Sequence, residues 1–586
     1  MTTSRGTGSQ VGALGARRMT WRWFALLAVL AALDLTACRR CTDESGARGE
    51  PGSAGLSAEA DRPLRQITIG IQQEPDTLWP TFHDMMVSEE VLGVGEASLT
   101  VFDENWQIQP LAATEIPTLI NGGVELLGEG KGMRVTWHLD PELAWPDGTP
   151  LTAEDYVFAH ELLVDRRYEV AERDIYEKIA SMHAEGADHK TLVVEWKEPY
   201  AYYHNYQVHP VLPRHIVEPR YRENPDTLIN DAFGVLPALA GSFTVAEWVR
   251  GSHIIVERNP AARGRWRPWF DRIIFRIIPS TQALEANLVS GTIDAISSGW
   301  LPLDRVEALQ VQHKDTFDFH YVEGLIFEHI DCNLSNPILA DVRVRRALMF
   351  ATDRERMVHT LVGERQQLAH SWVPPRRPDH NAEVRRYTHD LAEAARLLDE
   401  AGYRLGEGGV RHKDGAPLKL SIMTTSGHAT REKIEQMLQE DWRKVGIELE
   451  IHNQPAKVFF TETLRRRTFP ALAMFAWNMD PVADSATLWS CDQVPTQANG
   501  WMGRNYTGWC NEEVSAIHQQ IARTLDPARR ADLLKRQQLL WAEALPVLPL
   551  YFRIEPSITV KRLQGWRPTG TLVPVTWNAA QWQFRE

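Results

Sequence analysis

The side chains that could perform catalysis in this chain do not assemble into a known catalytic motif. His160 and Glu161 begin an H-E pair, but the second histidine of the H-E-x-x-H zinc motif is missing. Gly130 and Lys131 lack the upstream glycine and the following Ser or Thr of a P-loop, and no G-x-S-x-G nucleophile elbow is present. A dispersed Ser-His-Asp triad stays open, because such triads are defined by geometry. We predict no catalytic residues from these patterns.

Histidine is frequent, with 20 residues, but its spacing does not predict a metal site. The closest group is His204, His209 and His215, whereas structural zinc sites use tighter and more regular spacings. We expect these side chains to be ordinary surface or turn histidines, and we predict no metal and no other cofactor.

The five cysteines are too few to build a disulfide scaffold in a chain of 586 residues. Cys38 and Cys41 spell C-x-x-C, but a redox motif needs a strand before it and a helix after it, and a hydrophobic leader precedes this one. Cys491 and Cys510 are nineteen positions apart, so a disulfide between them would close a modest loop. Sequence alone leaves that pairing open.

Tryptophan is abundant, with 21 residues, and four of them fall within 33 positions: Trp477, Trp489, Trp501 and Trp509. Such amphipathic rings can line a pocket, stack on a ligand or fill a core. Core packing is the default interpretation for any one of them.

The first forty residues have the features of an export signal. Four arginines precede an apolar run over residues 23–33, namely Arg5, Arg17, Arg18 and Arg22. The run is too short to cross a ~30 Å hydrocarbon layer but suits a signal-peptide core. The twin arginines suggest the Tat route, but the residues after them fit it poorly, so we expect Sec-type export with a signal peptide over residues 1–37.

The end of this leader resembles a bacterial lipobox, with Leu35, Thr36, Ala37 and Cys38 in order. This resemblance implies diacylglycerol on Cys38, a membrane anchor, and a place in the cell envelope or periplasm. Residues 38–65 contain hardly any large apolar side chain and are predicted to be a flexible tether, because they cannot bury enough surface to offset ordering entropy. No later run of 18 apolar residues predicts another membrane span.

The length and the net charge of the chain indicate the number of lobes and the kind of partner. A single core stops growing near ~250 to 300 residues, so 586 residues predict two or three lobes. The net charge of -14 and the lack of a long basic run after residue 40 argue against nucleic acid as a partner. We expect a monomer that binds no nucleic acid.

The body of the chain alternates between strand and helix patterns. Residues 418–422 alternate as a strand, 434–445 follow helical spacing, and 447–451 alternate again. A second β-α-β unit runs from a strand at 273–278 through a helix near Ser280 to a strand at 293–296. The fold class is therefore α/β, with parallel strands covered by helices.

Short acceptor side chains mark several helix starts, namely Thr152 with Asp155, Asp341, Asp390 with Glu393, and Asp526 before Pro527. After Asp341 the apolar residues repeat with helical spacing. Arg343, Arg345 and Arg346 flank that stripe, and we interpret them as a solvated or ion-paired face.

Five stretches together resemble the extracellular solute-binding proteins that deliver oligopeptides, dipeptides and related solutes to ABC importers. They are residues 67–80 (ITIGIQQEPDTLWP), 143–158 (LAWPDGTPLTAEDYVF), 247–278 with ERNP at 257–260, 341–354 (DVRVRRALMFATDR) and 526–550 with DPARR and a terminal PVLPL. The resemblance covers about residue 66 to the C-terminus.

The resemblance implies a periplasmic-binding-protein architecture of two α/β lobes joined by hinge strands, with a third inserted domain. Matching the motifs places lobe I at 66–102, 236–325 and 541–586, the inserted domain II at 103–235, and lobe III at 326–540. It also implies that the chain is not an enzyme, that a peptide or other small solute binds between the lobes, and that an ABC permease and its ATPase receive it.

The same resemblance implies site residues. In peptide-binding members an aspartate shortly after a tryptophan pairs with the amino terminus of the ligand, and here Trp477 and Asp480 match W-x-x-D. The segment departs from the longer family pattern, so the alternatives are that Asp484 takes this role or that no residue does. Residues 505–508 resemble the N-Y-x-G segment near the cleft and add Asn505, Tyr506 and Gly508 to the predicted ligand-binding residues, together with Trp489.

Other functions remain open at this point. The cargo could be a sugar, haem or chelated nickel instead of an oligopeptide. A cell-envelope hydrolase or peptidase is the candidate from another class, and a sensory or structural envelope protein is a third.

Overall fold

The computed structural model describes residues 63–585, apart from 84, 129–130, 171–172, 206–207, 364, 480, 483–484 and 572. The predicted signal peptide, the lipidated Cys38 and nearly all of the tether lie outside the described residues. Asp480 and Asp484 also lie outside them. Within the described part, none of the helices combines the length and the apolar composition that a membrane span requires.

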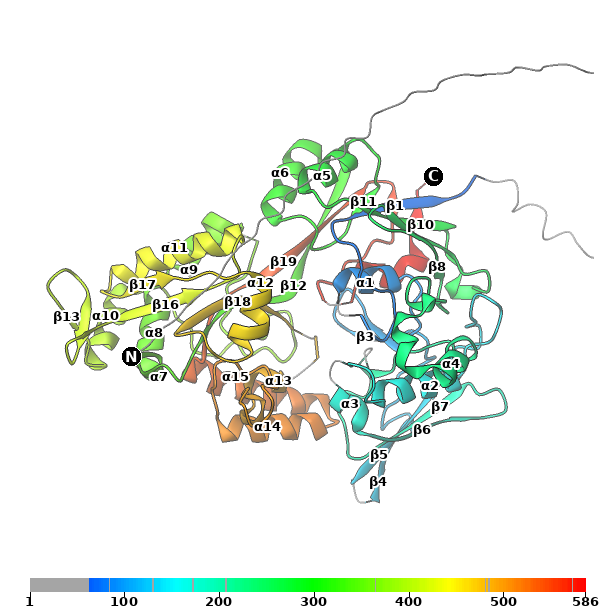
Figure 1. Cartoon of the computed structure of the whole chain (residues 1–586), viewed down its shortest axis with the longest axis horizontal. Helices are drawn as coiled ribbons and strands as arrows, with labels where there is room; N and C mark the ends of the chain where they lie inside the picture. The colour runs from blue at the N-terminus through cyan, green and yellow to red at the C-terminus, as the bar shows by residue number, and fades with distance from the viewer. Residues whose placement is uncertain are drawn as a thin grey trace, which may run out of the picture. The chain divides into compact units, whose positions relative to one another are not determined.

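A mixed ten-stranded sheet runs through the described part of the chain (Figure 1). In spatial order its strands are β17 (Glu448–Ile451), β16 (Lys419–Met423), β18 (Leu472–Asn478), β12 (Phe317–Cys332), β19 (Val547–Val560), β11 (Ala295–Ile296), β1 (Gln66–Ile71), β10 (Arg272–Ile277), β9 (His253–Arg258) and β8 (Phe243–Val249). β1 pairs in parallel with β10 and β11, and β16 pairs in parallel with β17 and β18. The other neighbours are antiparallel.

Both predicted β-α-β units are present. β16, α11 (Ala429–Arg443) and β17 form the first, and Gly446, with φ at +84°, reverses the chain after the helix. β10, α5 (Thr281–Val289) and β11 form the second, in which Ser280 accepts a hydrogen bond from the Ala283 N–H at the helix start. β1 lies between β10 and β11 and pairs with both. The sequence pattern does not reveal that intervening strand, because β1 comes from the distant N-terminal end of the body.

The long strands β12 and β19 connect two hydrophobic cores. Phe317 and Ile558 belong to one core, with β1 and β10, whereas Ile330 and Leu548 belong to the other, with β16 and α11. Their pairing shifts register beyond Gly324, where an added Cβ would lie 2.7 Å from the Arg553 carbonyl oxygen. A glycine is therefore required beside this carbonyl group.

The segment between β3 (Ile108–Pro110) and β8 carries its own four-stranded antiparallel sheet. The order is β4 (Val124–Leu127), β5 (Gly132–His138), β7 (Thr191–Trp196) and β6 (Ile179–Glu185). α2 (Ala153–Val164) begins at Thr152, which forms the predicted capping box with Asp155, and α4 (Arg214–Glu223) packs against α2. Trp137 and Trp196 are buried in the core of this sheet.

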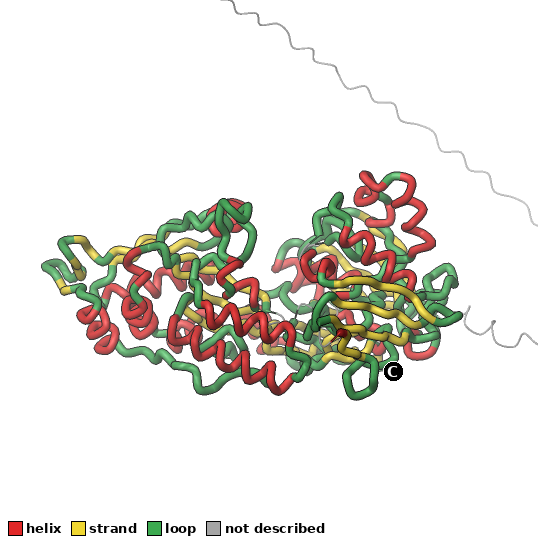
Figure 2. Tube along the Cα trace, turned by 90° about the horizontal axis from the view of Figure 1, so that it is seen from below, coloured by secondary structure: helices red, strands yellow, loops and turns green. Residues whose placement is uncertain are grey.

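Helices and strands occur in both halves of the body (Figure 2). The remaining helices are α1 (Met86–Leu92), α3 (Arg173–Glu177), α6 (Leu303–His313), α7 (Pro337–Ala340), α8 (Val342–Ala351), α9 (Arg354–Met357), α10 (Leu391–Glu400), α12 (Ala456–Val458), α13 (Ala486–Trp489), α14 (Glu512–Arg523) and α15 (Pro527–Ala544). The remaining strands are β2 (Thr100–Phe102), β3 (Ile108–Pro110), β13 (Arg404–Leu405), β14 (Arg411–Lys413), β15 (Ala416–Pro417), β20 (Leu563–Gln564) and β21 (Gln583–Phe584).

The interpretation of the arginines on α8 is wrong for one of the three. Arg343 and Arg346 form the expected ion pairs, with Asp341 and Glu543. Arg345 is instead 5% exposed, and its guanidinium donates to backbone carbonyl oxygens, including that of Leu545 at 2.9 Å. Helical spacing identifies the apolar stripe of α8. It does not reveal that a cation on the same helix donates hydrogen bonds to the free backbone carbonyl groups at the end of α15.

The description of the three histidines as surface or turn residues is wrong for His209. This side chain is 3% exposed, and burial lowers its pKa to about 3, so it stays neutral at pH 7. His215 lies 2.8 Å from Asp147, at the surface. No cluster of three or more His, Cys, Asp or Glu side chains suited to a metal ion occurs among the residues that the structure describes.

Candidate functional site

A cavity of about 1280 Å³ lies between segments that are far apart in the sequence. Its walls come from residues 80–98, which include α1, from residues 145–211 and 238–240, and from residues 465–523, which include β18 and α14. Representative lining residues from the three walls are Glu89, Glu96, Tyr176, Tyr200, Trp477, Arg504 and His518. The volume exceeds that of most small-molecule pockets, which are ~300 to 1,000 Å³, so the cavity has room for an extended molecule.

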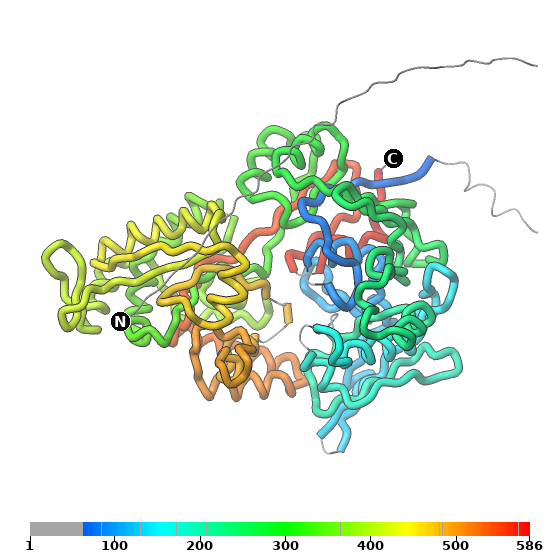
Figure 3. Tube along the Cα trace, viewed as in Figure 1, coloured from blue at the N-terminus to red at the C-terminus, as the bar shows by residue number. Residues whose placement is uncertain are grey.

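Two contacts close one side of this cavity. The Ala201 N–H donates to the Ala522 carbonyl oxygen at 2.7 Å, and Arg523 of α14 forms an ion pair with Glu198 at 2.6 Å. Figure 3 shows the two segments approaching each other below the long strands, one in cyan to green and the other in orange. These contacts join two segments that share a third core, which contains Tyr200 and Ile521. α1 and β18 complete the boundary of the cavity.

Trp477 occupies the wall of the cavity at the end of β18. Its ring stacks on Tyr506 with centroids 5.7 Å apart and meets the edge of Phe475 at 5.3 Å. Phe475 and Trp477 are two positions apart on one strand, so both side chains leave the same face of the sheet. Phe475 is buried and anchors the site, while Trp477 remains partly exposed to the cavity.

The N-Y-x-G segment supports the wall but does not line it. Asn505 is 1% exposed, and its side-chain amide donates to the carbonyl oxygens of Ser490 and Trp509. Gly508 has φ at +73°, and an added Cβ would collide with the Arg467 guanidinium. Asn505, Tyr506 and Gly508 are absent from the described lining, so Tyr506 can act on the cavity only through Trp477.

Trp489 is a core residue in this structure. It is 1% exposed and packs against Trp372 and Trp541, with ring centroids 5.7 and 5.6 Å away. Its neighbours Leu488 and Ser490 line the cavity, whereas Trp489 does not. The tryptophan cluster of the sequence therefore divides into one cavity residue, Trp477, and at least one packing residue.

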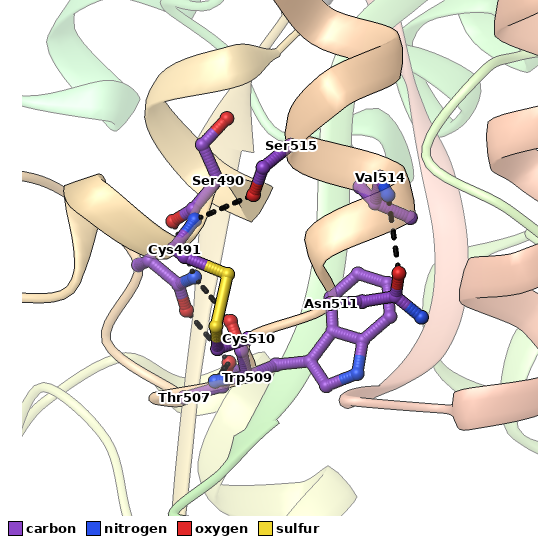
Figure 4. The surroundings of a disulfide bond; sticks show 9 residues. Ser490, Cys491, Thr507, Trp509, Cys510, Asn511, Val514 and Ser515 are labelled. Carbon is purple, nitrogen blue, oxygen red and sulfur yellow. Dashed lines mark hydrogen bonds between the residues drawn. A yellow bond between two sulfur atoms is a disulfide. The ribbon is translucent and has the colours of Figure 1, made fainter.

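A disulfide bond joins Cys491 and Cys510 (Figure 4). The Cys491 N–H donates to the Ser515 hydroxyl at 3.0 Å, and Asn511 caps α14 by accepting from the Val514 N–H at 3.1 Å. The bond closes the loop that carries Arg504 and Tyr506 and holds it against α14. Chain-entropy arguments give a loop of this length about 3 kcal/mol of stabilisation.

The placement of Asp480 stays a prediction, because this residue lies outside the described part of the chain. The structure describes the residue before it: Met479 is 4% exposed, lines the cavity and donates its backbone N–H to the Leu325 carbonyl oxygen at 3.0 Å. Asp484 is outside the described residues as well, and Ser485 after it lines the cavity.

The sequence patterns missed two carboxylates in the cavity wall, Glu89 of α1 and Glu96 of the following loop. Burial and the neighbouring Glu96 raise the pKa of Glu89 to about 8, and burial also raises the pKa of Glu96. His83 lies 3.7 Å from Glu89. No local motif marks the pair, since only the tertiary fold turns this end of α1 toward the cavity.

A second electrostatic element missed by the sequence patterns lies beside the long strands. Glu328 of β12 is fully buried and accepts from Arg431 at 3.1 Å and from Arg553 of β19. Burial alone would raise the pKa of Glu328, but Arg553 and Arg431 outweigh this effect and hold it at about 2. The carboxylate is therefore charged and ties α11 to both strands.

Comparisons with known proteins agree with this architecture. The oligopeptide-binding protein AppA of Bacillus subtilis is 23% identical over 562 residues, which cover 94% of this chain and 96% of that protein. The crystal structure of an oligopeptide binding protein from Thermus thermophilus with a pentapeptide superimposes with a TM-score of 0.71 and 28% identity, over 89% of this chain and 96% of that one. The crystal structure of NikZ from Campylobacter jejuni with Ni(L-His) superimposes with a TM-score of 0.71 and 21% sequence identity, over 89% of this chain and 100% of that one.

These similarities confirm the predicted α/β, two-lobed architecture with hinge strands. The model of the bacterial extracellular solute-binding proteins, family 5, matches residues 128–497, which is more than half of the chain. The match confirms the resemblance read from the five sequence stretches, and this chain belongs to the bacterial extracellular solute-binding proteins of family 5.

Proposed function

We propose that this protein captures oligopeptides in the cavity and delivers them, unmodified, to an ABC permease and its ATPase. Members of its family bind solutes and are not enzymes, so the protein is a binding protein. The observation that carries the proposal is the cavity of about 1280 Å³, which is walled by elements of both cores and large enough for an extended chain. AppA of Bacillus subtilis is named as oligopeptide-binding, and the Thermus thermophilus structure holds a pentapeptide.

A peptide that contacts both lobes would favour their closed arrangement, which the permease could recognise. A peptide in the cavity touches α1 on one side and β18 on the other, so it binds the closed arrangement better than an open one. β12 and β19 connect the two cores and are the elements about which the lobes would move. The permease can then recognise the closed form.

Asp480 is the proposed partner of the peptide amino terminus. Support comes from its neighbours in sequence, since Trp477 and Met479 both line the cavity. A carboxylate at this position would form a charge-assisted bond with the α-ammonium group, which is shared by every peptide. Backbone groups of the peptide can pair as in an added strand, which makes binding tolerant of side chains.

The proposed lobes keep the predicted boundaries: 66–102, 236–325 and 541–586 for lobe I, 103–235 for domain II and 326–540 for lobe III. Support for lobes I and III comes from their cores, because Ile67, Phe275 and Ile558 share one and Leu420 and Ile330 share another, which Leu548 of the range 541–586 also joins. The protein is proposed to be a monomer. A signal peptide covers residues 1–37, and a lipid on Cys38, the first residue of the tether 38–65, holds the protein at the membrane.

Ligand screening tests the function. The mature protein is mixed with a peptide library, Ni-histidine, haem and sugars, and thermal shifts and native mass spectra are recorded. We expect peptides to raise the melting temperature and to be recovered intact. Binding of only a nickel chelate, as in the NikZ structure, or of another non-peptide solute would refute the peptide assignment. Cleaved peptides would indicate a hydrolase instead.

A further inference from the structure

Glu89 and Glu96 form an acidic part of the cavity wall on the lobe I side. Both residues line the cavity, Glu89 from α1 and Glu96 from the loop that follows it. The Glu89 side chain is 27% exposed. Glu90, between them in sequence, is buried and accepts instead from Ser297 and Trp300, so it does not belong to the wall.

Neither cavity carboxylate is neutralised by a lysine or arginine in the described part of the chain. Glu89 has only His83 nearby, with 3.7 Å between Nε2 and Oε1, and Glu96 accepts from the Ser98 hydroxyl. Glu328 differs from this pair, because two arginines neutralise its buried carboxylate. Partly buried carboxylates without a cation are costly, and a ligand that supplies one would remove the cost.

The charge of the cavity differs between its walls. Arg465, Arg504 and Asp492 line it from lobe III, the same side as Trp477, and Arg173 and Lys178 line it from domain II, whereas the lobe I wall has Glu89 and Glu96 and no described lysine or arginine. On the lobe I wall a bound peptide therefore meets two carboxylates that have no arginine or lysine beside them among the described residues.

We propose that Glu89 and Glu96 bind a cationic side chain of the cargo, so that the protein prefers peptides containing lysine or arginine. This inference rests on the proposed function and specifies its substrate class. The cavity positions the carboxylates, the peptide provides the ammonium or guanidinium group, and the charge-assisted bonds favour basic peptides over neutral ones.

The protonation of Glu89 agrees with this assignment. The pKa of Glu89, raised to about 8 by burial and by Glu96, leaves this side chain mainly protonated at pH 7. The other titratable groups at the pair are His83, beside Glu89, and Tyr156, near Glu96. A bound cation stabilises the charged carboxylate, so it lowers the pKa of Glu89 and a proton leaves on binding.

Calorimetry with matched peptides tests the inference. The probes are alanine pentapeptides with a single Lys at positions two to five, together with twin sets carrying norleucine or Glu there. We expect at least one Lys peptide to bind at least about tenfold more tightly than its norleucine twin, with the Glu twin weakest. Lys peptides, and not norleucine peptides, should release a proton in paired buffers at pH 7.

Variants separate the carboxylate pair from general charge. Glu89→Gln/Glu96→Gln should remove the preference for Lys and keep the norleucine affinities within about threefold. The control Asp304→Asn/Asp532→Asn removes two exposed carboxylates outside the described lining and should keep the preference. Equal binding of Lys and norleucine peptides, or a preference that survives in the Gln variant, overturns this inference only. Failure of every peptide to bind refutes the proposed function as well.

Discussion

Removing the charge of Glu328 has a cost that can be worked out from its surroundings. Glu328→Gln keeps the size of the side chain but leaves Arg431 and Arg553 without their shared carboxylate. The fold lowers the pKa of Glu328 from its ordinary value of 4.5 to about 2. Since one pKa unit corresponds to about 1.4 kcal/mol, we expect the free energy of unfolding at pH 7 to fall by about 3 kcal/mol.

The pH dependence of this loss has a definite sign. Because the folded pKa lies below the unfolded one, the stabilisation by Glu328 is present above pH 4.5 and disappears as the pH falls toward 2. Wild type and Glu328→Gln should therefore differ by about 3 kcal/mol at pH 7 and by less than about half of that at pH 3. At lower pH the protonated wild-type side chain resembles the glutamine.

Urea unfolding of both proteins at several pH values measures the difference. Tryptophan fluorescence and far-ultraviolet circular dichroism should give coincident transitions, which is the condition for a two-state free energy. Glu323→Gln is the matched control on β12, because Glu323 accepts from Gln367 and has no ion pair among the described residues. It should lose less than about 1 kcal/mol. A gap for Glu328→Gln that is absent at pH 7, or unchanged at pH 3, contradicts this electrostatic explanation.

Four further outcomes are expected. Trp477→Ala should weaken peptide binding by about tenfold in calorimetry, because a ring in the cavity wall is lost; unchanged affinity would place the peptide elsewhere. Gly508→Ala should lower the unfolding free energy by about 1 to 2 kcal/mol, since its φ is +73°. Replacing Cys491 and Cys510 by Ser should cost about 3 kcal/mol in the same urea assay. Cys38→Ser should move the protein from the membrane to the soluble fraction on cell fractionation, and retention at the membrane would refute the lipid anchor.

Local sequence patterns correctly predicted several individual strands and helices. The strand and helix periods over 418–451 correspond to β16, α11 and β17 because apolar spacing alone decides which face of each element is buried. Thr152 and Asp155 marked the start of α2 for the same reason, since a capping box lies within four residues. The family motifs added the two-lobed architecture, which periodicity cannot provide.

The site was less predictable, because a residue type does not reveal which way the side chain faces in the fold. Trp477 and Trp489 are both tryptophans in one short stretch, yet one lines the cavity and the other fills a core. Asn505 fits a family motif, but it bonds backbone groups of its own loop. Glu89 and Glu96 resemble ordinary helix and loop carboxylates until the chain folds.

The pairing of β12 with β19 has a consequence for the engineering of this protein. Phe327 on β12 pairs with Phe552 on β19. The residues between them in sequence form the second core, so the two ends of this segment lie side by side in one pair of strands. Cutting both strands there would release a fragment whose two ends are one strand spacing apart, about 5 Å. Such a fragment could be cyclised, or grafted into a related host, with a connector of only a few residues.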